Sequence, residues 1–303
     1  LGGKPFDYSI KAMVWDSKSV ITKYVNDTGS LGTVKGFIEN GGSPSSYYVG
    51  MTVGEIWGYT VAGLFRDQAD IDSSAIHDFV QASDKVTRPG QVKIADLDPG
   101  NFAVDDHGDL RIIGNQSPRY RYGVNLSARW NGIGLSVFLQ GVGARDWYPG
   151  SDAGMFWGKY GRPFFALIPS IHNYTDDMYS AERNNWDTAY WPRMTTYQSN
   201  GTKNWTRLLE IPNTRYIQSA AYLRVKNIQL DYSFPKHICS AIRLQGLKIY
   251  VNAENLFTFT PLHKYAPNFD PEGLSYDSDF ASAADGYTYP ILKSVTVGVN
   301  ITF

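Results

Sequence analysis

A long segment of the chain, residues 147–205, gathers aromatic and acidic side chains of the kind that bind sugars. Trp157, Tyr160, Trp186 and Trp191 stand among several aspartates there. Aromatic rings offer a large apolar surface, and carboxylates accept protons from hydroxyl groups. We predict these four aromatics as ligand-binding residues. The alternative is that so long a segment uses its rings to build a small core of its own.

Two arginines form a second candidate for ligand binding. Arg119 and Arg121 lie on one side of an alternating segment, with Arg129 further along. A guanidinium group presents several donors to a polar ligand. We predict Arg119 and Arg121 as ligand-binding residues. Pairing with acids on neighbouring strands or on an inserted plug is an equal alternative.

The segment from Asp96 to Asp109 is rich in carboxylates that a calcium ion can use. Asp96 and Asp98 match the first two positions of an EF-hand loop, but Pro99-Gly100 interrupts the pattern. This segment has two interpretations, a Ca²⁺ site or a solvated, turn-rich loop. No other metal and no cofactor are expected, because the five histidines are isolated and Cys239 is the one cysteine.

Catalytic motifs are missing from the sequence. There is no nucleophile elbow, P-loop or dinucleotide fingerprint. Asp270-Pro-Glu272 supplies two neighbouring carboxylates, but an acid–base couple needs one of them to have a raised pKa. We therefore predict no catalytic residue and no enzymatic activity.

Composition narrows the class of protein. The 303 residues include 28 Lys and Arg against 29 Asp and Glu, and this balance argues against nucleic acid as a partner. Aromatic residues make up 15%. The sequence contains no run of 18 apolar residues, which excludes a helical membrane protein but leaves open a membrane β-barrel, whose strands alternate.

The elements that must position these side chains are strands. Period-two alternation predicts six of them, with a bulge or a change of environment near Lys226 in the fourth and a hairpin turn at Asn131-Gly132 between the second and third. Their ranges are 6–14, 119–130, 133–139, 221–234, 247–254 and 294–303.

The connections between these strands run long, short, long, short, long. Outer-membrane barrels have this pattern, with long extracellular loops and short periplasmic turns, whereas a soluble sandwich has no reason for it. On the second strand, Tyr120, Tyr122 and Trp130 bracket an apolar stretch, as expected for a lipid-facing wall with aromatic belts. The same pattern places Phe303 on the periplasmic side.

Several motifs in order along the chain resemble one family. They resemble the C-terminal part of a SusC/RagA-type TonB-dependent outer-membrane transporter of the Bacteroidetes. The matching stretches are Asp16–Tyr24, Gly50–Tyr59 with Gly63-Leu-Phe65, Ile113–Gly123, Ala189–Arg193, Tyr222–Pro235, Asn252–Thr258, Asp270–Glu272 and Tyr289-Pro290.

This resemblance implies an all-β fold, a large antiparallel transmembrane β-barrel of about 22 strands with a plugged lumen. Residues 1–303 would form the C-terminal portion of that one barrel, without the plug, the TonB box and the earlier strands. It also implies a SusD-like lipoprotein lid, TonB acting on the absent plug, and a last strand ending in Phe303 that outer-membrane assembly machinery reads as a signal.

The function expected is active import of a nutrient oligosaccharide across the bacterial outer membrane, energised through TonB. A peptide importer of the RagAB type is an alternative within the family. A siderophore or cobalamin receptor of the same barrel class is a further one. From another class, a secreted, soluble β-rich carbohydrate-binding protein or glycoside hydrolase also accounts for the aromatic segment.

Overall fold

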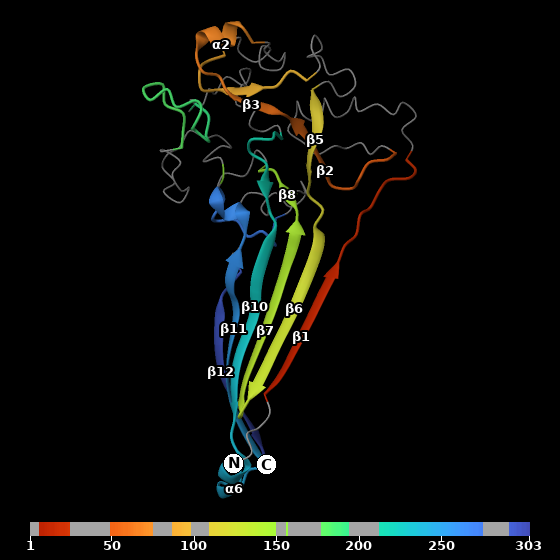
Figure 1. The fold of residues 1–303 in the computed structure, drawn as a ribbon, viewed down its shortest axis with the longest axis vertical. Helices are drawn as coiled ribbons and strands as arrows, with labels where there is room; N and C mark the ends of the chain where they lie inside the picture. The colour runs from red at the N-terminus through yellow and green to blue at the C-terminus, as the bar shows by residue number, and fades with distance from the viewer. Residues whose placement is uncertain are drawn as a thin grey trace.

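A computed structural model of the chain describes residues 6–24, 49–74, 87–97, 109–149, 156, 177–193, 212–274 and 291–303. Its main feature is a tall antiparallel sheet in the order β1-β6-β7-β10-β11-β12 (Figure 1). The strands are β1 (Asp7–Trp15), β6 (Arg119–Trp130), β7 (Ile133–Ala144), β10 (Tyr222–Ser233), β11 (Gly246–Phe259) and β12 (Ser294–Thr302).

The shorter elements divide between the two ends of this sheet. The helix α6 (Lys236–Ala241) lies at one end, beside the C-terminus (Figure 1). The other end carries α2 (Gln68–Asp72), the 3-10 helix η1 (Pro261–Lys264) and three small strand pairs. These pairs are β2 (Glu55–Tyr59) with β5 (Leu110–Asn115), β3 (Val61–Leu64) with β4 (Val92–Ile94), and β8 (Asp146–Trp147) with β9 (Gln218–Ser219).

The six predicted strands are all present and neighbour one another in antiparallel pairs. Asn131 and Gly132 both have positive φ, 46° and 88°, as a two-residue type I′ hairpin requires. The bulge predicted near Lys226 is confirmed, because the register of β10 with both neighbours shifts between Val225 and Asn227. Local alternation was sufficient to predict these elements.

The small strand pairs were not predicted. Both β2–β5 and β3–β4 lie within the long connection between β1 and β6. Because the connection between β1 and β6 contains an even number of these short strands, the chain still enters β6 from the end at which it left β1. The long and short connections of the main sheet therefore alternate as predicted. The motifs that contain Ile56 and Gly114 pair directly with each other in β2 and β5.

The hydrophobic core lies outside the main sheet. We call it the loop-end core, since its residues come from the segments that connect the strands at the end opposite α6. It consists of Leu64, Val92, Trp147, Tyr148, Phe156, Met178, Tyr179, Ala189, Trp191, Tyr216, Ala220, Leu262, Ala266, Phe269 and Leu274. In the main sheet, by contrast, β1 and β12 leave most of their side chains exposed and β6 leaves half of them exposed, and most residues of β7, β10 and β11 are partly or fully buried.

The all-β fold class is confirmed by this arrangement. Within the described ranges, β1 and β12 are the edges of the sheet, and no helix combines the length and apolar character that crossing a bilayer requires. A closed barrel of about 22 strands, and residues 1–303 as one portion of it, remain predictions.

Candidate functional site

One face of the main sheet is apolar over all six strands. The strand register aligns Ile10 with Leu126, Leu126 with Val137, and Val251 with Val297, so these side chains project from the same face. We call this the apolar face. Many of its side chains are open, with Val297 72% exposed. So large an exposed apolar surface marks an interaction with an apolar partner or a membrane.

Aromatic side chains bound the apolar face at both ends. Tyr120 and Phe259 lie toward the loop-end core, and Trp130 and Tyr232 lie toward α6. Ten residues separate Tyr120 from Trp130, or about 33 Å along a strand. At a strand tilt of about 40° this distance spans about 25 Å, the height of the apolar band of an outer-membrane barrel.

The opposite face of the sheet is polar. Asn227 donates to Asn252 Oδ1 at 2.8 Å across β10 and β11. Asp231, 3% exposed, lies between Arg129 and Lys248, with its Oδ1 at 3.6 Å and 3.2 Å from their side-chain nitrogens. We call this the polar face, and the charge of its buried Asp231 is balanced by cations from β6 and β11.

A glycine allows one of these contacts to cross an intervening strand. Gly134 of β7 lies between Arg129 of β6 and Asp231 of β10 in the register. A Cβ at Gly134 would lie 2.6 Å from Asp231 Oδ2. The space above this glycine is therefore what lets the buried carboxylate sit between two cationic neighbours.

The two predicted ligand-binding arginines differ in their surroundings. Arg119 makes a two-pronged ion pair with Asp16, with both nitrogen–oxygen distances at 2.5 Å. The Arg119 guanidinium lowers the pKa of Asp16 to about 2. Arg121 is exposed on the polar face. Arg119 thus shows the strand-to-strand pairing that was its alternative role, and ligand contact by Arg121 stays a prediction.

The four aromatic residues predicted to bind ligand also differ in their surroundings. Trp191 is 0% exposed and packs between Phe156 and Tyr216, at ring-centroid distances of 5.1 Å and 5.8 Å. A ring enclosed in this way has no face free for a sugar, so the prediction for Trp191 is corrected to a packing role. Trp186 packs against the loop-end core while partly exposed, and Trp157 and Tyr160 lie outside the described residues.

Backbone contacts hold Trp191 in place. Its N–H donates to Asp177 O at 2.9 Å, and its carbonyl accepts from Tyr179 N at 3.0 Å. Arg215 donates to Tyr190 O at 2.9 Å and also to Ala189 O. The Ala189–Arg193 motif is therefore a fixed part of the loop-end core.

An ion-pair network that sequence reasoning missed joins the two regions. Arg224 of β10, 3% exposed in its side chain, bonds Asp270 at 2.6 Å and Glu272 at 2.5 Å. Lys226 bonds Glu272 at 2.8 Å. The Asp270–Glu272 carboxylates are thus neutralised by cations, an arrangement suited to fixing a loop.

A second arginine holds the same loop from its backbone. Arg145, between β7 and β8, donates to Pro271 O at 3.1 Å and also to Leu274 O. The sequence does contain a signal for this network. The motif Tyr222–Pro235 has two basic residues near its start, and the motif Asp270–Glu272 has two acids, which lie 46 and 48 residues after Arg224.

Metal ligands were predicted only for the segment Asp96–Asp109. Most of that segment, residues 98–108, lies outside the described residues, while Asp109 Oδ1 accepts from Leu97 N at 2.8 Å. In the described part of the chain, no group of three His, Cys, Asp or Glu side chains is arranged to hold a metal ion. Calcium at this loop stays a prediction.

The sequence relatives of this chain are all of one kind, TonB-dependent receptors. No family model matches the chain. It is 25% identical to TonB-dependent receptor P3 of Formosa agariphila over 84% of this chain and 22% of that receptor. It is 22% identical to TonB-dependent receptor P26 of the same organism over 95% of this chain and 27% of that receptor. The chain therefore spans well under a third of each relative's length.

Solved structures show a similar fold. The structure of the RagAB peptide transporter matches 85% of this chain and 24% of that chain, with a TM-score of 0.51 and 17% identity. The RagAB peptide importer in the closed-closed state matches with a TM-score of 0.50. At this identity the likeness concerns the fold alone. In sequence and in fold, the chain resembles part of a TonB-dependent transporter of the SusC/RagA type, as its motifs predicted.

Proposed function

We propose that this chain forms part of the wall and the extracellular loops of an outer-membrane barrel that imports a nutrient oligosaccharide. The observation that carries the proposal is the two-faced sheet, whose apolar face has aromatic side chains at both ends, ten positions apart along β6. The similarity to TonB-dependent receptors supports it. In this role the chain binds and encloses solute and performs no covalent chemistry.

The polar face supplies the lumen wall. Its amide, hydroxyl and charged groups, such as Asn252, Gln229 and Arg121, match the hydrogen-bonding needs of sugar hydroxyls. The loop-end core sits at the mouth of this wall, where a SusD-like lipoprotein would close over the ligand. TonB would act on the plug of the barrel.

Peptide import is the second candidate. The observation in its favour is the likeness of the fold to the RagAB peptide transporter. Peptides would use the same polar face through backbone hydrogen bonds, and the burial of Trp191 removes one ring that a sugar would have stacked on.

The experiment has two stages, since location and substrate are separate questions. Cells expressing the protein are fractionated, and the outer-membrane pellet is washed with alkaline carbonate and tested for heat-dependent migration on gels. Recovery of a folded, wash-resistant protein is expected. A protein released into the soluble fraction contradicts the proposal and favours the secreted carbohydrate-binding alternative.

Substrate is then tested by uptake into these cells. Fluorescent oligosaccharides and fluorescent peptides of similar mass are supplied with and without an active TonB. Oligosaccharide uptake that disappears without TonB is expected. Uptake of peptides alone overturns the oligosaccharide proposal in favour of the second candidate, and equal uptake without TonB contradicts energised import.

The last residue offers a test of assembly. Phe303 follows β12, is 82% exposed and lies at the same end of the sheet as α6. If outer-membrane assembly machinery reads this aromatic end, Phe303→Asp lowers the amount of folded protein in the membrane, whereas Thr302→Ser leaves it unchanged. Full insertion of Phe303→Asp contradicts the assigned role.

A further inference from the structure

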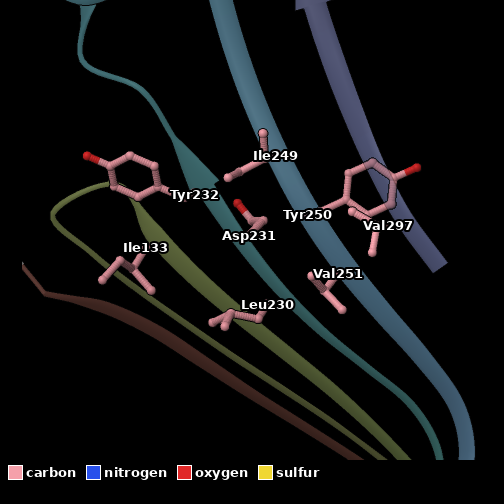
Figure 2. Close-up of a pocket in the computed structure, with 8 residues that line it drawn as sticks. All are labelled: Ile133, Leu230, Asp231, Tyr232, Ile249, Tyr250, Val251 and Val297. Carbon is pink, nitrogen blue, oxygen red and sulfur yellow. The ribbon is translucent and has the colours of Figure 1, made fainter. Parts of the chain in front are cut away.

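A hollow of about 350 Å³ interrupts the apolar face near its α6 end (Figure 2). The side chains that line it from the apolar face are Ile133, Leu230, Tyr232, Ile249, Val251 and Val297. They come from two adjacent rows of the register, Tyr232 with Ile249 and Leu230 with Val251. Asp231 and Tyr250 complete the lining. On the apolar face, β11 and β12 contribute only the short branched side chains of Ile249, Val251 and Val297, which leaves a recess beside the larger Tyr232 ring.

The connection at this end of the sheet is unusually basic. Residues 235–246 contain Lys236, His237 and Arg243 and include no Asp or Glu. All three basic side chains are exposed. The hairpin of Asn131-Gly132 beside it is uncharged, and Asp7, the nearest exposed acid on β1, belongs to the polar face opposite Arg129. The basic side chains therefore face no acidic side chain of their own connection.

The same connection exposes apolar side chains. Ile238 and Ile242 are 39% and 53% exposed. Four residues separate them, which in a helical turn places side chains on one side. Cys239 is buried and its Sγ lies 3.7 Å from Phe234 O, so α6 is anchored to the end of β10. Exposed apolar groups flanked only by basic ones are typical of a segment that lies at a lipid headgroup layer.

We propose that α6 and the hollow together bind one anionic phospholipid, with its phosphate at Lys236 and Arg243 and an acyl chain in the hollow. The charge of the connection selects the headgroup, and the hollow is continuous with the apolar face. Six residues separate Leu230 from Lys236, at most about 20 Å along an extended chain and about 15 Å in height after tilt. One leaflet of a bilayer has this thickness.

This inference rests on the proposed location in the outer membrane and adds a specific lipid to it. The leaflet concerned is the one at the α6 end, which the alternation of long and short connections assigns to the periplasmic side. The bound lipid would fix the β10–β11 connection against the membrane, at the end of the sheet where the loop-end core provides no packing.

The test uses the protein extracted from its own outer membrane into mild detergent. Native mass spectrometry measures binding of phosphatidylglycerol and of phosphatidylcholine with the same acyl chains. The wild type is expected to prefer phosphatidylglycerol. Lys236→Gln with Arg243→Gln should lower that preference by about 25-fold, since each basic residue at an anionic surface contributes about fivefold.

Matched controls separate this site from general charge and hydrophobicity. Lys18→Gln with Lys293→Gln makes the same change of charge at the opposite end of the sheet, where both residues are exposed, and should leave the preference unchanged. Val297→Phe fills the hollow and should reduce retention of both lipids, while Val295→Phe, on the same face of β12 but outside the lining, should not.

Two results would overturn the inference. Equal binding of the two lipids by the wild type would make the hollow ordinary lipid-facing surface, and an equal effect of both double variants would remove the role of α6. Each variant is also tested for outer-membrane recovery and heat-dependent migration. Absence of the wild type from the outer membrane contradicts the proposed function, whereas normal insertion without lipid preference contradicts this inference alone.

Discussion

The main sheet and the loop-end core bury apolar side chains in opposite ways. The sheet presents Val297 and its neighbours outward and leaves them uncovered within the chain, whereas the loop-end core encloses Trp191 on all sides. The first arrangement is suited to an apolar solvent, and the second is that of a water-soluble protein. Under the proposed function, one chain therefore combines a wall whose stability depends on the membrane with a small folded region whose stability does not.

The two regions meet at the network of Arg224 with Asp270 and Glu272. Arg224 belongs to the wall, and the acids belong to the loop that also contributes Leu274 to the loop-end core. Burial of the guanidinium without these partners would be costly, because an isolated buried charge loses its hydration. This network should decide whether the two regions unfold together or separately.

Truncation of Trp191 should have the largest effect on the difference in stability between the two regions. Trp191→Ala removes a fully buried ring and should destabilise the loop-end core by about 4 kcal/mol. The wall should stay inserted, because its strands are held by the membrane. Limited proteolysis reports the loops, and heat-dependent migration on gels reports the wall.

Trp186→Ala is the control for that variant, since Trp186 is only partly enclosed and should cost much less. Loss of wall insertion in Trp191→Ala would show that the two regions are one cooperative unit. Equal protease sensitivity of both tryptophan variants would contradict the burial argument.

Removal of Arg224 tests the junction. Arg224→Ala leaves the carboxylates of Asp270 and Glu272 close together and without their buried partner, and should cost about 3 kcal/mol. Urea unfolding of the protein in detergent, followed by tryptophan fluorescence, measures the loss. Arg66→Ala breaks an exposed ion pair and should change stability far less. A similar loss in both variants would count against a special role for the junction.

A charge placed on each face of β12 distinguishes the two sides of the wall. Val297→Arg puts a guanidinium on the apolar face and should destabilise the protein in lipid vesicles by about 2 kcal/mol or more. Thr296→Arg, one residue away, places the same group on the polar face and should be nearly neutral. Equal effects in reversible unfolding from vesicles would refute the assignment of the faces.

The pH dependence at Asp16 is the smallest expected effect. The pKa of Asp16 is about 2 in the folded chain, below its ordinary value of 3.8, so its ionised form is favoured by folding. The stabilisation is complete above about pH 4 and disappears as the pH falls through about 2. The difference in urea midpoint between the wild type and Asp16→Asn should therefore shrink over this window; a difference that persists at pH 2 would exclude the Arg119 pair as its cause.

Pattern reasoning was successful where a local rule decides the structure. The alternation of Tyr122, Val124 and Leu126 predicted the apolar face, and Asn131-Gly132 predicted the hairpin, because neighbouring residues are enough to define both. The small pair β2–β5 was missed, because Trp57 and Ile112 are far apart in the sequence and each strand is too short to show a period.

By itself, the sequence determined the six strands, their two faces and the end of the sheet at which each connection lies, because backbone geometry fixes a period of two wherever a strand forms. The tertiary structure alone decided that Trp191 is enclosed by Phe156 and Tyr216 and that Arg224 meets Asp270. These contacts join segments far apart in the chain. Such contacts depend on how whole segments pack and on which charges that packing buries, and no local pattern records them.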